Sequence, residues 1–409
     1  MTEVRTRFAP SPTGFLHVGG IRTALFAYLV AKQSDGTFVL RLEDTDKSRE
    51  VAGSREHLLA SLKALHLDYD EGPDISGDYG PYVQSERLGI YAQYAQKLID
   101  AGLAYADPYT SEEIQSFREK AQAEKRAFRY RDYRPEVLPA WDGTKPLRFK
   151  STPKSYTYRD EVMGDITTSP EVIDDLILIK SDGYPTYNFA HIVDDAEMQI
   201  SHVIRGQEFI SSMPNFLALY EALGLERPIF AHMPHIMNEQ GNKKLGKRDG
   251  AKDVLDYIRD GYLPETLDSF IATLGWNDGT EQEVFTMDEL VEKFDLSRVQ
   301  KSGARFDEKR LLWMNAMLET GTTMRWQRAQ AWIGHSVVNI DTPSLVIDLD
   351  AMERNMARMA GFASEHGVRL RPHAKMHKSA ELARLQMDHG AVGVCVQKTD
   401  EALALAHAG

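Results

Sequence analysis

Two short segments of the chain carry residue types that suit the binding of a polyphosphate. Residues 7–20 read RFAPSPTGFLHVGG, a glycine-rich stretch that contains His17. Residues 244–248, more than two hundred positions later, read KLGKR and hold two lysines and an arginine. Each segment alone is more often an ordinary turn. Together they indicate one anion site, because backbone N–H groups and lysine side chains both bind phosphate oxygens.

The elements around the first segment place it where α/β proteins bind phosphates. Residues 4–9 predict a strand, proline and glycine then break it, and apolar periodicity predicts a helix from Gly20. His17 then lies just before a helix N-terminus, where unpaired N–H groups and the helix dipole favour an anion. A second apolar strand, at 38–42, ends in carboxylates that begin with Glu43. This right-handed βαβ unit puts Glu43 at the ligand-binding edge of a parallel sheet.

Composition sets the broad class. The chain has 409 residues, of which 42% are hydrophobic and 27% charged, and its formal net charge is −13. The length favours about two to three domains, and the acidic balance argues against broad coating of nucleic acid while leaving room for a local basic groove. The single cysteine, Cys395, excludes a disulfide framework and a zinc site built from several cysteines. With no apolar leader or membrane-length segment, we expect a cytoplasmic protein without a membrane partner.

Several ordered segments resemble a known family. Residues 7–20, 38–46 and 244–248 resemble the class I aminoacyl-tRNA synthetases, and among these the bacterial glutamyl-tRNA synthetases. Further segments of the same likeness are 80–87, 181–190, 193–195 and 202–206, so that the resemblance covers about residues 1–320. It implies a Rossmann-like, doubly wound parallel sheet over 1–250, with an inserted acceptor-binding region at about 75–180, and a helical stem-contact region over 251–320.

The resemblance implies an ATP-dependent reaction. L-Glutamate and ATP would form glutamyl-adenylate, and the glutamyl group would pass to the 3′-terminal adenosine of tRNA(Glu). His17, Gly19, Gly20, Lys244 and Lys247 would bind ATP with Mg²⁺, and His17 and the two lysines would act in catalysis. Such a transfer needs positioning and charge stabilisation more than a strong base. Residues 244–248 form what we call the basic loop. The family's usual serine in this loop is glycine at position 246, which we expect to change the loop's dynamics without abolishing activity.

Glutamate would be chosen by charge. The positions that match the family's glutamate-binding residues are Arg7, Ser11, Glu43, Tyr187 and Arg205. The arginines suit carboxylates, and Glu43 suits the ammonium. A carboxamide side chain would leave an arginine unpaired, which is a costly mismatch in a closed pocket. The alternatives are a core aromatic for Tyr187 and a surface salt bridge for Arg205.

A basic stretch in the insertion is the candidate contact with RNA. Its cations, interleaved with aromatic residues, are Lys125, Arg126, Arg129, Arg131 and Arg134. Such a mixture suits phosphates and unstacked bases, although a charged connecting turn explains it equally well. Relatives that hold zinc near this region use cysteines, and this chain has none before Cys395. Asp194 and Asp195 follow an apolar run and are expected to be structural, so no metal site is predicted in the protein.

The C-terminal part predicts another fold. After a junction at 321–340, residues 341–409 predict a βαβαβα order in six elements: 344–349, 352–366, 368–371, 380–389, 392–396 and 401–407. The segments 341–343 and 371–378 resemble the N-terminal part of D-threonine aldolases and D-serine dehydratases, pyridoxal-phosphate enzymes on an alanine-racemase-like barrel. That likeness implies Lys375 as the Schiff-base lysine. A full barrel needs about 250 residues, so we expect this fragment to be inactive and not to bind pyridoxal phosphate.

The alternatives remain open at this point. An enzyme that glutamylates the queuosine base of tRNA(Asp), a fragment of a pyridoxal-phosphate aldolase or dehydratase, and a non-catalytic tRNA-binding module each explain part of the chain. We expect a monomer. The sequence leaves undecided whether tRNA(Gln) is charged as well, how much activity survives without anticodon-binding domains, and whether 341–409 is a natural fusion or a misassembled chain.

Overall fold

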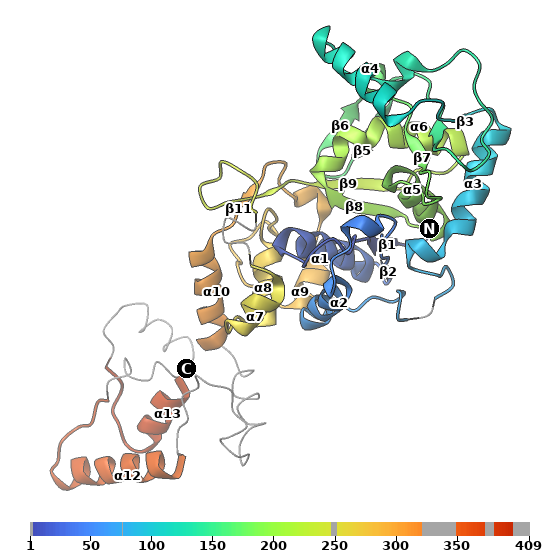
Figure 1. Ribbon diagram of the computed structural model, residues 1–409. Helices are drawn as coiled ribbons and strands as arrows, with labels where there is room; N and C mark the ends of the chain where they lie inside the picture. The colour runs from blue at the N-terminus through green and yellow to red at the C-terminus, as the bar shows by residue number, and fades with distance from the viewer. Residues whose placement is uncertain (1–2, 76, 247–251, 321–348, 373–379, 396–409) are drawn as a thin grey trace. The chain divides into compact units, whose positions relative to one another are not determined.

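The computed structural model describes residues 3–75, 77–246, 252–320, 349–372 and 380–395. Figure 1 shows them as a coloured ribbon. The chain divides into two units, Met1–Glu308 and Lys309–Gly409, and each is described by itself.

A mixed six-stranded sheet forms the centre of the first unit. Its order is β2-β1-β8-β9-β5-β6, and every neighbouring pair is parallel except the β5–β6 hairpin. The strands are β1 (Arg5–Phe8), β2 (Thr37–Leu40), β5 (Thr157–Asp160), β6 (Gly164–Thr167), β8 (His202–Gly206) and β9 (Ile229–Met233). The register sets Arg7 opposite Val39 and Arg205 opposite His232. The carboxyl ends of β1, β2, β8 and β9 therefore meet at one edge, as expected for a Rossmann-like sheet.

Helices pack on this sheet through apolar faces. Helix α1 (Val18–Gln33) contacts β1, β2 and β8 (Figure 1), and its apolar residues are buried along most of its length. Helices α3 (Leu88–Asp100), α5 (Tyr187–Glu197) and α6 (Met213–Leu223) pack against one another in the main hydrophobic core. Helix α1 begins at Val18, two residues before the expected start at Gly20, because His17 serves as its N-cap. The glycines at 19 and 20 thus lie in the first helical turn.

The segment expected as the insertion holds a second sheet of three antiparallel strands: β3 (Ala104–Ala106), β4 (Leu147–Phe149) and β7 (Ile177–Ile179). Helix α4 (Ser111–Ala123) begins at a capping box between Thr110 and Glu113. The hairpin β5–β6 also falls within 75–180, yet it pairs with β9 and so extends the central sheet.

Short helices follow the basic loop. The helical region expected over 251–320 contains α7 (Val254–Arg259), α8 (Pro264–Ala272) and α9 (Met287–Lys293). Helix α1 packs against α8 and α9, and α2 (Ser54–Ala64) packs against α7. Strand β10 (Ile236–Met237), which precedes the basic loop, pairs in parallel with β11 (Ala304–Arg305), which lies near the end of this region. Helix α10 (Glu308–Thr320) follows.

The second unit shows two of the expected elements. Helix α12 (Leu349–Glu365) begins three residues before the expected start at 352, so Leu349 is helical instead of ending a strand, and α13 spans Ala380–Asp388. No strand forms at 368–371 within the described residues. The neighbouring segments are nevertheless joined by two hydrogen bonds, from Val392 N to Leu370 O at 3.0 Å and from Cys395 N to Pro372 O at 2.7 Å. Residues 392–395, expected to begin a strand over 392–396, form no strand among the described residues either. Most of the strand expected at 344–349, the helix expected at 401–407, the junction 321–340 and Lys375 lie outside the described residues.

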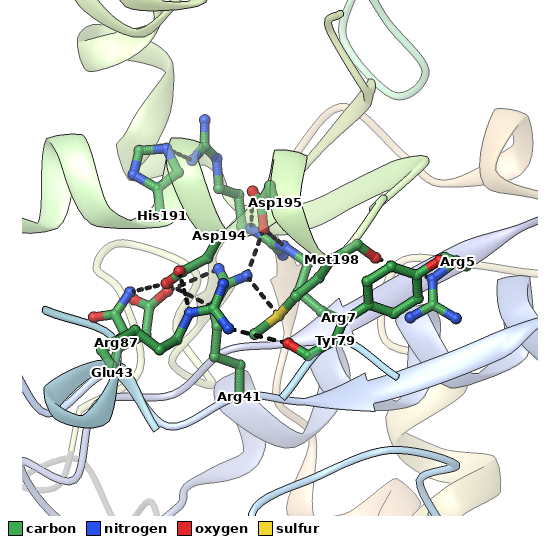
Figure 2. A network of polar contacts seen from close by, with 12 residues as sticks. Arg5, Arg7, Arg41, Glu43, Tyr79, Arg87, His191, Asp194, Asp195 and Met198 are labelled. Atoms are coloured by element: carbon green, nitrogen blue, oxygen red, sulfur yellow. Dashed lines mark hydrogen bonds and ion pairs between the residues drawn. The ribbon is translucent and has the colours of Figure 1, made fainter. Parts of the chain in front are cut away.

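A buried carboxylate ties α5 to α3. Asp194 has no exposed surface, and its carboxylate accepts hydrogen bonds from Arg87 Nε at 2.7 Å, from the Tyr91 hydroxyl at 2.9 Å and from Gln84 Nε2 at 2.8 Å. Arg87 is the N-cap residue of α3 and is itself buried. Among the described residues, Asp194 is the carboxylate that pairs with Arg87, and Asp194 is also paired with neighbouring Arg41 (Figure 2).

Replacing Asp194 with alanine should leave the guanidinium of Arg87 buried without its carboxylate. We expect the free energy of unfolding to fall by about 3–5 kcal/mol, measured by urea denaturation followed by far-UV circular dichroism. The matched control is Asp260→Ala, which removes a half-exposed pair with Lys252 and should cost less than about 1 kcal/mol. Equal urea midpoints for the two variants would contradict the assignment.

Candidate active site

One cavity of about 1030 Å³ opens at the carboxyl edge of the central sheet. Of the residues predicted for ligand binding, its lining includes Arg7, Ser11, His17, Gly19, Gly20, Glu43, Tyr187, Arg205 and Lys244. The two sequence segments that indicated an anion site thus line the same cavity. Lys247 lies outside the described residues.

The first segment forms the capped start of α1. His17 Nδ1 accepts the backbone N–H of Gly19 at 3.0 Å, which satisfies one of the free donors of the first turn. A Cβ at Gly20 would lie 2.6 Å from Leu16 Cδ1, so glycine here makes room for close packing under the turn. Neither glycine has a positive φ. The helix dipole favours an anion at this end of α1.

The residues just after the basic loop form backbone contacts with this turn. His17 forms a β-bridge with Asp253, and Val254 N donates to Leu16 O at 3.4 Å. His57 on α2 lies with Nε2 3.2 Å from Asp253 Oδ1, and its ring stacks on Phe15 at 4.5 Å between centroids. Asp253 also caps α7. The segment 7–20 and the chain that follows the basic loop at 244–248, the two signature segments, are therefore held together at one place, which is the contact of Leu16 and His17 with Asp253 and Val254.

Lys244 is the first residue of the basic loop. It bridges to Met237 of β10, and Leu245 N donates to Ile236 O at 2.8 Å, which fixes the backbone there. Its ammonium is about half exposed and lies 3.7 Å from Glu208 Oε1. This separation is at the outer limit of an ion pair, and exposed pairs of this kind are weak, so the charge of Lys244 remains available to an anion in the cavity.

Arg7 on β1 already has a carboxylate partner, which the sequence did not predict. Arg7 Nε donates to Asp195 Oδ1 at 3.0 Å, and Nη1 donates to Ile204 O at 3.3 Å. Asp195 is fully buried. Burial alone would raise its pKa, but Arg7 and Arg41 hold the pKa of Asp195 well below its usual range. Arg7 thus lines the cavity, but the side of its guanidinium that can bind both oxygens of a carboxylate is directed at Asp195.

Glu43 lies at the end of the second strand, as expected, and is joined to the same network (Figure 2). Its Oε1 accepts from Arg41 Nη2 at 3.0 Å, while Arg41 Nη1 donates to Asp195 Oδ1 at 2.8 Å. Burial raises the pKa of Glu43 to about 7, although Arg41 opposes that shift. Arg41 was missed by the sequence reasoning. Its signal was a charged residue within the apolar run 38–42.

Tyr187 and Arg205 complete the polar part of the cavity. Tyr187 is the first residue of α5, stacks on His191 at 4.6 Å, and has its pKa raised to about 12 by burial. Arg205 on β8 is buried, donates to two histidines, and is flanked by the rings of Phe209 and Phe216. Arg205 is therefore not a surface salt bridge, while Tyr187 both lines the cavity and packs against the hydrophobic core. Ser11 lines the cavity with an exposed side chain.

Comparison with known proteins decides the family. Residues 3–313 match the family described as tRNA synthetases class I (E and Q), catalytic domain. The chain belongs to this family of class I synthetases. Residues 347–409 match a second description, alanine racemase, N-terminal domain, which confirms the resemblance expected for the C-terminal part.

Individual relatives of this class I synthetase are similar over the same region. The glutamate–tRNA ligase of Clostridium kluyveri is 47% identical over 323 residues, 77% of this chain and 66% of the relative. That of Clostridium botulinum strain Hall is 48% identical over 321 residues, 76% of this chain and 66% of the relative. The chain thus spans just under two thirds of the length of these curated relatives.

Solved structures agree with the fold. The glutamate–tRNA synthetase of Elizabethkingia anophelis aligns with a TM-score of 0.75 at 36% identity, covering 86% of this chain and 77% of that one. A glutamate tRNA ligase from Elizabethkingia meningosepticum, solved in complex with its amino acid, aligns with a TM-score of 0.72 at 35% identity, covering 90% of this chain and 74% of that one. The predicted Rossmann-like class I fold is therefore confirmed.

In this synthetase, the basic stretch expected to contact tRNA largely serves the insertion itself. Arg134 Nη2 donates to Asp175 Oδ1 at 2.5 Å, and Arg131 Nη1 donates to Ile173 O at 2.6 Å. Both guanidinium groups therefore fix the loop before β7. The sequence could not reveal this because the acceptors lie about forty residues away.

The other cations of the stretch are also engaged, except for one exposed lysine. Arg126 pairs with Glu124 at 2.6 Å, and Arg129 pairs with Asp132 at 3.2 Å. The stretch's aromatic Tyr133 stacks on Phe117 of α4 at 4.2 Å. Lys125 is exposed in a left-handed conformation with φ of 54°. The alternative of a charged connecting turn explains these contacts better than a free basic patch does.

Asp194 and Asp195 occupy structural positions, as expected. Both accept from arginines in the core, in contacts described above. Among the described ranges, no group of three or more His, Cys, Asp or Glu residues is arranged to hold a metal ion. No helix in those ranges is long and apolar enough to cross a membrane.

Proposed function

We propose that the chain is the catalytic part of a glutamate–tRNA ligase, which forms glutamyl-adenylate from L-glutamate and ATP and transfers the glutamyl group to the 3′-terminal adenosine of tRNA(Glu). The observation that carries this proposal is the single cavity that combines a helix N-terminus and Lys244 with the buried charges Arg7, Glu43 and Arg205. The first set suits a polyphosphate and the second an amino acid with two carboxylates. The names of the relatives at 47–48% identity support the same reaction.

The ATP half of the cavity works by positioning and charge. Gly19 and Gly20 at the start of α1 let the phosphates approach the backbone and the positive end of the helix dipole, and His17 stabilises charge that develops near the α-phosphate. Lys244 and Lys247 hold the phosphates and follow the charge onto pyrophosphate. Mg²⁺ arrives with ATP, whose phosphates supply most of its ligands, and it neutralises part of their charge.

The glutamate half relies on complementary charge. Glu43 accepts from the substrate ammonium, while Arg205 pairs with a substrate carboxylate and Arg7, already bound to Asp195, adds positive charge to the pocket. Ser11 and Tyr187 add hydrogen bonds. Because the arginines are buried, glutamine would leave a cation unpaired at a large cost in binding free energy. The pocket therefore selects glutamate before any tRNA is read.

We propose tRNA(Glu) as the acceptor, a monomeric state and a cytoplasmic location. The alternative acceptor is the queuosine base of tRNA(Asp), and comparing unmodified tRNA(Glu) with queuosine-containing tRNA(Asp) separates the two. Incorporation of labelled glutamate into the second RNA alone would replace the ligase proposal with that alternative. A protein that binds tRNA but shows no pyrophosphate exchange would be a non-catalytic module.

Alanine at Lys247 or Lys244 should slow ATP–pyrophosphate exchange. Each substitution removes a cation that stabilises phosphate charge in the transition state, so we expect a loss on the order of 100-fold or more, measured with L-glutamate and tRNA(Glu) present. The control is Lys252→Ala, which breaks only a surface pair with Asp260 and should keep near-normal exchange. Near-normal exchange in Lys247→Ala would refute the role of the basic loop.

The binding of glutamate should strengthen as pH rises through about 7. Burial raises the pKa of Glu43 to about 7, so its carboxylate is mostly protonated at pH 6 and mostly ionised at pH 8. Only the ionised form accepts from the ammonium, and we expect roughly a tenfold gain in affinity between these pH values by calorimetry. In Glu43→Gln the affinity should be weak and independent of pH. The same pH profile in that variant would show that another group titrates.

A further inference from the structure

Arg205 differs from the other buried arginines around the cavity. Arg7, Arg41 and Arg87 each pair with at least one of the carboxylates of Asp194 and Asp195. Arg205 is only 5% exposed, yet it makes no ion pair with any carboxylate in the described part of the chain. A buried cation without a carboxylate is costly, so its surroundings must be built to hold it.

The first group that holds Arg205 is His232 on β9. Asp160 Oδ2 lies 2.6 Å from His232 Nδ1, and His232 Nε2 lies 3.2 Å from Arg205 Nε. Burial alone would raise the pKa of Asp160, but the hydrogen bond from His232 and backbone N–H groups lower it, so the carboxylate is ionised. An ionised carboxylate only accepts, and the proton of His232 is therefore on Nδ1. Its Nε2 lone pair is left to accept the Arg205 Nε–H.

The second group is His191 on α5. His191 Nδ1 lies 2.7 Å from Tyr187 O, and its Nε2 lies 3.3 Å from Arg205 Nη1. A carbonyl oxygen also only accepts, so the proton of His191 is again on Nδ1 and Nε2 accepts from the guanidinium. The far hydrogen bond of each histidine thus sets the tautomer that faces Arg205.

Both imidazoles are neutral in this setting. Burial, together with Arg205, lowers the pKa of His191 to about 3. Burial also lowers the pKa of His232, in spite of the opposing effect of Asp160. The guanidinium carbon of Arg205 lies over the rings of Phe209 and Phe216, 4.9 Å from the centroid of each. Arg205 is therefore oriented by lone pairs and rings, while the carboxylate of Asp160 contacts the other nitrogen of His232.

We propose that His191 and the Asp160–His232 pair are positioning residues that hold Arg205 as a cation without a carboxylate partner, ready for a carboxylate of the amino-acid substrate. The inference rests on the proposed function and deepens it. It assigns the choice of a carboxylate over a carboxamide in part to neutral acceptors that do not touch the substrate's reacting atoms. A residue that brought its own negative charge to Arg205 would occupy the place of the substrate.

The decisive comparison is His191→Gln with His191→Glu, which have nearly the same shape. The glutamine amide oxygen can accept from Arg205 without charge, so we expect KM for L-glutamate to stay within about threefold of wild type. The glutamate carboxylate would pair with Arg205, and KM for L-glutamate should rise on the order of 10- to 100-fold. KM for ATP and kcat at saturating glutamate should change little, a split that a general loss of structure would not produce. Equal KM values for the two variants would overturn the proposal.

Asp160→Asn tests the second arm. Asp160 Oδ1 accepts the backbone N–H of Val162 at 3.1 Å and of Met163 at 2.9 Å, so an amide oxygen would stay there and the NH₂ group would face His232. His232 Nδ1 would then accept, its proton would move to Nε2, and Arg205 would lose an acceptor. We expect about a tenfold rise in KM for L-glutamate. The control is Asp165→Asn on exposed β6, which should leave KM unchanged.

A spectroscopic measurement separates this inference from the proposed function. Nitrogen–proton correlation spectra of labelled histidines report the tautomer of each ring without any substrate. We expect Nδ1–H neutral rings for His191 and His232 at pH 7, and a shift of His232 to Nε2–H in Asp160→Asn. Protonated or Nε2–H rings in the wild type would overturn the inference whatever the substrate is. Expected tautomers in a protein that fails to bind glutamate would instead contradict the proposed function.

Discussion

The pair of adjacent carboxylates on α5, Asp194 and Asp195, is the constraint on which the rest of the cavity depends. Both are fully buried, and two like charges in a dry core must be matched by cations brought from elsewhere. Arg41 lies between them, with Arg87 and Arg7 on either side (Figure 2). These contacts join α5 to β2, to the start of α3 and to β1. The floor of the cavity is thus fixed by charge pairing as well as by apolar packing.

This arrangement assigns different tasks to charges that look alike in the sequence. The guanidinium groups of Arg7 and Arg41 both donate to Asp195, and Arg41 also donates to Glu43. Glu43 shares Arg41 with two other carboxylates, so it is only partly compensated and its pKa is raised by burial to about 7. Arg205, by contrast, is contacted by neutral acceptors alone in the part of the chain that the structure describes. One positive and one negative group are thereby left available to a zwitterionic ligand with an extra carboxylate.

Much of the fold followed from local patterns, and the polar pairing did not. The strand–turn–helix around His17, the strand before Glu43 and the helices after the basic loop are set by apolar periodicity and by breakers, which act over a few residues. The pair Arg41–Asp195 spans 154 positions, and the pairs of the basic stretch with Asp174 and Asp175 span about forty. Nothing local identifies such partners. For the same reason, the β5–β6 hairpin was placed in the insertion although it extends the central sheet.

The separation of the two signature segments in the sequence has a structural counterpart in the contact that holds them together. Leu16 and His17 pair with Val254 and Asp253 along the backbone, and His57 holds the side chain of Asp253 from α2. The chain therefore enters the basic loop from β10 and leaves it at the turn that caps α1. Lys244 at the start of this loop and Asp253 after it are held by backbone contacts, Lys244 to β10 and Asp253 to the turn at the start of α1. This tether explains why two motifs more than two hundred residues apart are informative only as a pair.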